Sequence, residues 1–312
     1  MERWPSGLRR TLGKRVKGQL FRGFESRSLR QKVIFFIKKK CKLIADMKFV
    51  DPSLNYLIPF KFDDLGRIGG EFDGGYVVPK RPFDETDVLI SFGMGDSFDL
   101  EDNYSNSNGI VHVYDHTVNL NIFILRFLKQ VKRLLYFKSN FDSIKNRFRT
   151  IKKYYLANKN KNFVHFKKKI SNSINFKEDI LVEDVFKKIS SNNIFLSIDI
   201  EGDEYKILKE VTYYSERVNL LIVEFHDIEN NLNIFQENVK TILEDFIIVH
   251  LHGNNCSYIS KYGIPNVLEI TFVNKKKYKT LQNRSKVLKF PINDLDQPNH
   301  PYIKDLNFQF SV

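Results

Sequence analysis

The sequence predicts an α/β protein built on a mostly parallel sheet. From Met47 onward, short apolar runs of strand length alternate with stretches of helical periodicity, which is the pattern of parallel strands joined by helices. Polar or glycine-rich residues follow five of the apolar runs. We found no internal repeat and no proline-rich linker, so we expect one domain over 47–312.

The expected elements can be placed in chain order. A glycine-rich segment over 63–79 leads into one short strand at Tyr76-Val77-Val78. A helix is expected from about Phe98, another over 180–189, and a third beginning near Tyr205. The seven strands of the sheet are expected at 88–92, 111–114, 163–166, 194–200, 220–225, 246–251 and 267–273.

Residues 118–160 are predicted to form one or two amphipathic helices. Apolar residues such as Phe127, Leu128 and Val131 recur at helical spacing. The stretch 118–170 holds 15 Lys or Arg residues against one acid, Asp142. Basic amphipathic helices suit an anionic membrane or glycan surface. A solvated basic face without a partner is the alternative.

The first 46 residues hold most of the positive charge. They carry 14 Lys or Arg and 3 Asp or Glu, which is +11 of the formal net charge of +13. The other residues therefore carry a net charge of only +2, which is poor evidence that the folded domain binds nucleic acid. Residues 4–9 and 23–26 back-translate to sequences that resemble the D-arm and T-arm of a bacterial serine transfer-RNA gene. We therefore expect 1–46 to be a mis-called, disordered upstream extension. A basic targeting arm is the competing interpretation.

The cysteine content and the hydropathy of the chain indicate the kind of cellular compartment in which the protein is expected. The two cysteines, Cys41 and Cys256, give neither a disulfide framework nor a metal-ligand spacing. A reducing, cytoplasmic location is expected. No run of 18 or more apolar residues occurs, so no transmembrane helix is predicted.

The run Asp199-Ile200-Glu201 is the strongest chemical signal in the chain. It joins the apolar strand over 194–200 to the following helix, with Asp203 and Glu204 next in sequence. Acids in a first helical turn are favoured by the helix dipole alone. Asp199, however, lies inside the apolar strand, where a charge is costly unless it is used. We expect Asp199 and Glu201 at the ligand-binding edge of the sheet.

The first predicted strand ends in Gly93-Met94-Gly95-Asp96, where glycines let a ligand approach the backbone. Phe98 stands where the third glycine of a GxGxxG fingerprint would be, which disfavours pyrophosphate binding and a dehydrogenase. Asp115, at the end of the next strand, suits the two hydroxyls of a ribose. Plain turn glycines and a structural cap are the alternatives.

Two histidines at strand ends are candidate bases, because imidazole titrates near neutral pH. His226 follows one strand and His252 ends another, with Asn254 and Asn255 next in sequence. Either histidine could instead be structural, or a metal ligand with Asp199, although the spacing specifies no metal site. His250 is expected to be structural.

The order of these motifs resembles the FkbM-type class I methyltransferases, which use S-adenosyl-L-methionine. The resemblance covers roughly residues 55–305, and the Asp199-Ile200-Glu201-Gly202 run is its most specific part. The other motifs that carry it are Gly69-Gly70, Asp73-Gly74-Gly75-Tyr76, Ser91–Asp96, Val223–His226, His250–Asn255, Pro265–Thr271 and Leu295–Asn299.

The resemblance implies a Rossmann-like fold. We expect a seven-stranded, mostly parallel sheet whose last strand is antiparallel, helices on both faces, and a basic helical insertion at about 118–160. It also implies an enzyme that methylates a hydroxyl of a sugar or another small acceptor. The alternative is a non-catalytic module that keeps the fold and binds an anionic membrane or glycan surface.

The resemblance further assigns roles to the site residues. Gly93, Gly95 and Asp96 would lie at the methionine end of the cofactor and Asp115 at its ribose. Asp199 and Glu201 would lie beside the transferred methyl group, with His226 or Asp199 as the base. His252, Asn254 and Asn255 are assigned to the acceptor or to structural support, and no metal is expected.

Overall fold

The computed structural model describes residues 48–107, 109–136, 138–278 and 283–311. Contacts divide the chain into residues 1–44 and residues 45–312, and all described residues belong to the second unit. The expected extension over 1–46 lies outside the described residues.

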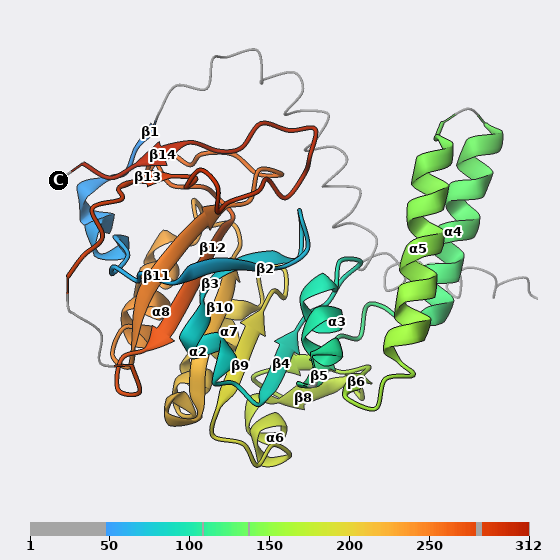
Figure 1. Cartoon of the computed structure of the whole chain (residues 1–312), viewed down its shortest axis with the longest axis horizontal. Helices are drawn as coiled ribbons and strands as arrows, with labels where there is room; N and C mark the ends of the chain where they lie inside the picture. Colours follow the sequence, from blue (N-terminus) through green and yellow to red (C-terminus); the bar gives the residue numbers. More distant parts are fainter. Residues whose placement is uncertain (1–47, 108, 137, 279–282, 312) are drawn as a thin grey trace, which may run out of the picture. The chain divides into compact units, whose positions relative to one another are not determined.

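A seven-stranded sheet forms the centre of this unit (Figure 1). Across the sheet the order is β11-β12-β10-β9-β4-β5-β6, and β12 is antiparallel to both of its neighbours. The strands are β4 (Val88–Phe92), β5 (Ile110–Tyr114), β6 (Phe163–Phe166), β9 (Ile194–Ile198), β10 (Val218–Phe225), β11 (Phe246–Gly253) and β12 (Leu268–Asn274). All seven predicted strands are confirmed, as is the antiparallel last strand, but β9 ends at Ile198, so Asp199 and Ile200 lie just beyond the strand and not inside it.

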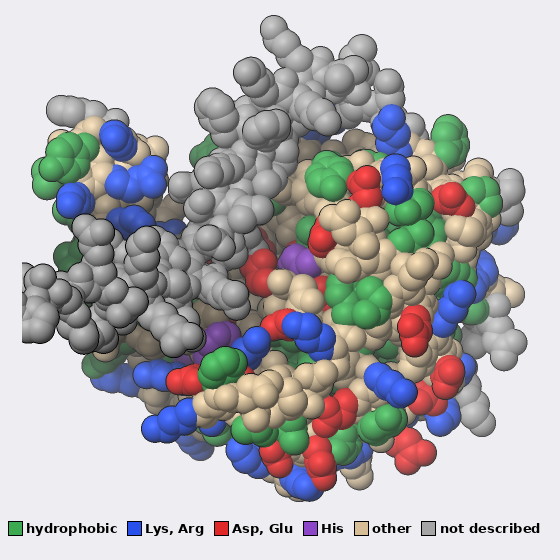
Figure 2. All heavy atoms as spheres, turned by 180° about the vertical axis from the view of Figure 1, so that it is seen from behind, with side chains coloured by type: hydrophobic (Ala, Val, Ile, Leu, Met, Phe, Trp, Pro, Cys, Tyr) green, Lys and Arg blue, Asp and Glu red, His purple; other side chains and the backbone are tan. Residues whose placement is uncertain are grey.

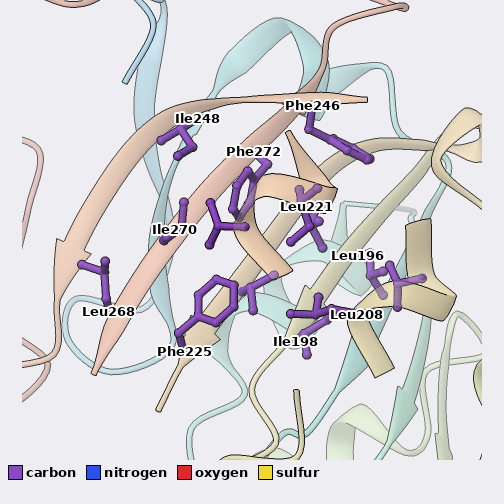
Figure 3. Close-up of a cluster of buried hydrophobic side chains, with 14 of the residues drawn as sticks. Leu196, Ile198, Leu208, Leu221, Phe225, Phe246, Ile248, Leu268, Ile270 and Phe272 are labelled. Atoms are coloured by element: carbon purple, nitrogen blue, oxygen red, sulfur yellow. The ribbon is translucent and has the colours of Figure 1, made fainter. Parts of the chain in front are cut away.

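Helices cover both faces of the sheet. α6 (Val182–Lys187), α7 (Glu204–Thr212) and α8 (Leu232–Ile242) pack on one face, and α3 (Asp99–Asn106) on the other. Because side chains alternate along each strand, Leu196 and Ile198 enter one core while Phe195 enters the other. Figure 3 shows part of the first core, between β9–β12 and α7. Every residue of β4, β9 and β10 is buried, as expected of strands covered on both faces.

Two short elements differ from the prediction. Residues 179–181 form strand β8 (Asp179–Leu181), which pairs with β7 (Lys169–Ser171), so helix α6 begins at Val182 rather than Ile180. The glycine-rich lead-in forms two strands instead of one, β2 (Leu65–Gly69) and β3 (Gly75–Pro79), paired as a hairpin. In both cases a partner strand supplies hydrogen bonds that local periodicity does not reveal.

Smaller elements complete the unit. The strands β1 (Lys48–Phe49), β14 (Phe308–Gln309) and β13 (Lys289–Phe290) form a separate three-stranded sheet, which brings the two ends of the described chain together. The remaining short helices are η1 (Pro52–Leu57), α2 (Lys80–Asp84) and η2 (Ser215–Arg217).

The basic insertion forms two helices side by side, α4 (Leu120–Leu135) and α5 (Phe141–Ala157) (Figure 1). Each begins at an asparagine whose side-chain oxygen accepts a backbone N–H in the first turn, Asn119 for α4 and Asn140 for α5. We call the two helices and their 136–140 connection the basic hairpin. None of the described helices combines the length and apolar character needed to cross a bilayer.

Candidate functional site

The order of the parallel strands defines where a ligand would bind. Numbered along the chain, the six parallel strands follow the order 3-2-1-4-5-6 across the sheet, with the antiparallel strand between the fifth and sixth. In the sheet, β5 lies on one side of β4, whereas β9, the next parallel strand of the chain after β6, lies on the other side of β4. Ligands of doubly wound sheets bind at the carboxyl ends of strands beside such a switch point. Here those ends carry Gly93 and Asp199.

The loop after β4 depends on glycine. Gly93 has φ +87°, and a Cβ atom there would lie 1.8 Å from the backbone oxygen of Asp199. Gly93 therefore lets the ends of β4 and β9 approach each other. Gly95 has φ +60°, and no atom lies within 4 Å of where its Cβ would be. The backbone at Gly95 thus faces open space, as a loop that receives a ligand requires.

Asp115 holds this loop in place. Its Oδ2 accepts hydrogen bonds from the backbone N–H groups of Met94 and Gly95, each at 3.0 Å. Its Oδ1 accepts from the backbone N and the Oγ1 of Thr117, both at 2.6 Å. The buried carboxylate is therefore engaged at both oxygens with the protein itself. The structure gives Asp115 a loop-holding role, and its assignment to the ribose stays a prediction.

Asp96, predicted to lie at the cofactor, contacts the basic hairpin. Its Oδ1 pairs with Arg126 of α4 and its Oδ2 with Arg147 of α5, the latter at 2.6 Å. The three side chains are only 21–30% exposed, so water screens these two ion pairs less than it screens ion pairs on the surface. The loop after β4 is thus tied to both helices of the hairpin.

His226 lies among four carboxylates that come from three segments of the chain. The group consists of Asp199 and Glu201 after β9, Glu204 at the start of α7, and Glu224 near the end of β10; we call it the acid cluster. The Nε2 atom of His226 lies 3.6 Å from Glu224, 3.7 Å from Asp199 and 3.7 Å from Glu201. Its Nδ1 lies 3.4 Å from Glu204. The structure thus brings together Asp199, Glu201 and His226.

The acid cluster sets the charge of His226. Burial opposes protonation of the ring, but the interaction with Glu204 and the charges of Glu224 and Asp199 raise the pKa of His226 to about 10. Burial, together with the charge of Asp199, raises the pKa of Glu224 well above its ordinary value. His226 is therefore an imidazolium at neutral pH. A ring that already holds a proton cannot accept another, so this charge argues against His226 as the base, and the base role of Asp199 stays a prediction.

Sequence reasoning missed three residues of this site. Glu204 is fully buried and accepts hydrogen bonds from the backbone N–H groups of Gly202 and His226, both at 2.8 Å. It joins the loop after β9 to the end of β10. Glu224 accepts from Asn254 Nδ2 at 2.8 Å. Burial and the charge of Asp199 raise the pKa of Tyr76 on β3. The DGGY motif, Asp73–Tyr76, was the only signal for Tyr76.

The same group has the spacing for a metal ion. Asp199, Glu224 and His226 each offer an atom, and these atoms lie within 4.8 Å of one another. Carboxylates with one imidazole suit a divalent transition metal. Such an ion would have to displace the proton of His226. The prediction that no metal is present therefore stays untested.

Of the residues in and just after β11, one contacts the acid cluster and the others support the fold. Asn254 reaches the acid cluster through Glu224. Asn255 is buried and bonds the backbone of His300 and Ile303, which is structural support. His250 pairs with Asp296 at 2.8 Å in a buried position, in keeping with its expected structural role.

His252 belongs to a separate buried group. Its Nδ1 lies 3.1 Å from Glu269 and its Nε2 3.5 Å from Asp305. Burial opposes its charge, but these two carboxylates raise the pKa of His252 to about 10. Asn299 donates to the other oxygen of Glu269 at 2.6 Å. These bonds fix the segment around Asn299 and Asp305 over the end of β11.

Comparisons with known proteins leave the family open. No protein-family model and no curated protein matches the chain. A search of solved structures finds M. jannaschii TYW2 in complex with AdoMet, with 9% identity over 61% of this chain and 70% of that chain and a TM-score of 0.29. A TM-score this low carries no argument about fold or function. The resemblance to the FkbM-type family stays a prediction.

Proposed function

We propose that this protein is an S-adenosylmethionine-dependent methyltransferase that acts on a hydroxyl group. The observation that carries the proposal is the position of the acid cluster: Asp199 follows β9 at the switch point, and its backbone lies against Gly93 in the loop that also carries Gly95. A cationic ligand seated on the glycine loop would meet negative charge at this edge of the sheet.

The charge of the site supports a cationic cofactor. Even with the pKa of Glu224 raised, the other three carboxylates outnumber the one imidazolium. The side chains of Glu204 and Glu224 are 0% and 5% exposed. Like charges gathered in a buried place are stabilised by a positive partner. S-adenosylmethionine carries a positively charged sulfur, whereas its product, S-adenosylhomocysteine, is neutral there. The residues present therefore fit this cofactor.

The chain's own residues would then perform the remaining tasks. When bound, the cofactor supplies a methyl group already activated by the sulfonium, so the protein mainly aligns the acceptor and removes its proton. We assign the acceptance of that proton to Asp199, whose side chain is 33% exposed. His226 keeps its own proton and balances the charge of the carboxylates. Glu204 holds the loop and strand end that carry these two residues.

The acceptor class comes from the resemblance alone. FkbM-type enzymes act mostly on hydroxyl groups of sugars and other small compounds, so we propose a sugar or similar hydroxyl here.

The charge argument is tested by comparing the two ligands. Replacing Asp199 by Asn should weaken binding of S-adenosylmethionine about tenfold, the loss expected for one charge-assisted contact, and affect neutral S-adenosylhomocysteine less. Asp203→Asn is the matched control, because Asp203 lies in the same loop but pairs with Lys169 and Lys206. Equal losses for both ligands would contradict the proposed role of Asp199.

Turnover gives a second test. Full-length protein is incubated with S-adenosylmethionine and a panel of sugars, and release of S-adenosylhomocysteine is followed with and without a chelator. Asp199→Asn should lower turnover more than His226→Gln if Asp199 is the base. The reverse order would return the base role to His226. Loss of turnover with the chelator would assign Asp199, Glu224 and His226 to a metal.

A further inference from the structure

The basic hairpin is attached to the core at one end only. Its buried residues are Phe123 in the first turn of α4, and Tyr154 and Ala157 in the last turn of α5. The rings of Phe123 and Tyr154 lie 5.0 Å apart, and both contact Phe98 of the core. From 124 to 153 none of the described residues is buried. Most of the length of both helices therefore lies outside the core.

Along its whole length the hairpin exposes large apolar side chains, where a solvated helix pair would carry polar ones (Figure 2). Each of eight residues is 49–78% exposed. They are Leu125, Leu128, Leu135, Tyr136, Phe141, Phe148, Tyr155 and Leu156. Eight such side chains on one helix pair exceed the scattered surface residues of an ordinary soluble domain. The hairpin thus has an apolar surface that the described chain does not cover.

Lysines are interleaved with these apolar residues. On α5, steps of four and three residues place Phe141, Lys145, Phe148, Lys152 and Tyr155 on one face, and all five are exposed. On α4 the same spacing aligns Leu125, Leu128, Lys132 and Leu135, again all exposed. A lysine stem can lie along apolar surface while its ammonium group reaches outward. Both helices therefore present apolar groups flanked by cations.

The charge of the hairpin is strongly one-sided. Residues 118–160 hold 11 Lys or Arg residues and one acid, Asp142. Arg126, Arg147 and Lys153 pair with Asp96 and Asp99 at the attached end. Of the other eight basic residues, seven are distributed along the rest of the hairpin, and Lys159 lies just after it. Such a surface repels a second copy of itself and attracts a polyanion.

We propose that the basic hairpin docks this protein on an anionic lipid surface. The leucines and aromatic rings would enter the boundary between headgroups and acyl chains, and the lysines would reach the lipid phosphates. Nucleic acid or a soluble acidic glycan would engage the cations but leave the exposed leucines in water. Of these three polyanions, only a lipid surface binds the cations and also buries the exposed apolar side chains.

Vesicle binding of the full-length protein tests the proposal. Co-sedimentation is measured with phosphatidylcholine vesicles and with equimolar phosphatidylcholine and phosphatidylglycerol vesicles. Two double variants alter the exposed face of α5: Phe141→Ser with Phe148→Ser, and Lys145→Gln with Lys152→Gln. Tyr213→Ser and Lys209→Gln are matched controls, because both residues are exposed at the end of α7.

The proposal predicts tighter binding to the anionic vesicles, at least about a tenfold loss in each hairpin variant, and no change in the controls. Amide hydrogen exchange over 120–157 should slow on the anionic vesicles. If both hairpin variants bind like the wild type, as they would if residues 1–46 carried the binding, the proposal is overturned. Heparin binding without vesicle binding would equally overturn it in favour of a soluble polyanion.

Discussion

Replacement of Asp115 by Asn separates the loop-holding role of this residue from the predicted ribose contact. The carboxylate accepts four hydrogen bonds, two from Met94 and Gly95 and two from Thr117. An asparagine of the same size offers one carbonyl oxygen, so its amide group must face one pair of donors. Two bonds to a charged group are then lost, each contributing about 1.5–3 kcal/mol.

We therefore expect Asp115→Asn to lower the free energy of unfolding by about 3 kcal/mol or more. Urea unfolding measures this loss, and calorimetry below the unfolding transition measures the affinity for S-adenosylmethionine, which should fall because the Gly95 loop is no longer fixed. Asp87→Asn is the control, since Asp87 is exposed and its carboxylate accepts from the side chains of Ser191 and Asn193 at the surface. Unchanged stability with lost affinity would refute the loop-holding argument and favour a direct ligand contact.

Three further predictions follow from individual residues. Gly93→Ala should destabilise the protein by about 2 kcal/mol more than Gly202→Ala, because both positions have positive φ but only at Gly93 does the new Cβ meet another atom, the oxygen of Asp199. Burial raises the pKa of Glu101 to about 7 from 4.5, so its contribution to stability is complete below pH 4.5 and is lost as the pH rises through 7. Glu101→Gln should remove this fall of about 3 kcal/mol between acidic and mildly alkaline pH, measured by urea unfolding. Asp96→Asn should speed amide exchange in the basic hairpin by breaking its two arginine contacts.

Each of these predictions has a clear contrary result. Equal losses in the two glycine variants would mean that backbone strain alone accounts for both. Parallel pH profiles for wild type and Glu101→Gln would show that the buried carboxyl does not titrate near neutral pH. Unchanged exchange in Asp96→Asn would mean that the packing of Phe123 and Tyr154 alone fixes the hairpin.

The sequence predicted the sheet well because its strands are buried on both faces. Runs such as Val88–Phe92 and Ile194–Ile198 have the length of a strand and are apolar except for one serine each. The start of α6 was missed because Asp179–Leu181 is a strand only through its pairing with Lys169–Ser171. A contact between distant segments leaves no trace in local periodicity.

The candidate site was predictable only in part for the same reason. Asp199 was identified because the sequence predicted a charge inside an apolar strand, which is unusual. In the structure β9 ends at Ile198, and Asp199 is the first residue after it. Glu204 was passed over, because an acid in a first helical turn is explained by the helix dipole, and its full burial becomes visible only in three dimensions. The charge of His226 likewise depends on three carboxylates, those of Asp199, Glu204 and Glu224, which come from three segments.

The most direct test of the proposed function is calorimetric titration of the full-length protein with S-adenosylmethionine and, separately, with S-adenosylhomocysteine. The account predicts that both ligands bind at one site and that Asp199→Asn weakens the cationic ligand more than the neutral one. If the folded protein binds neither ligand, the methyltransferase proposal is wrong.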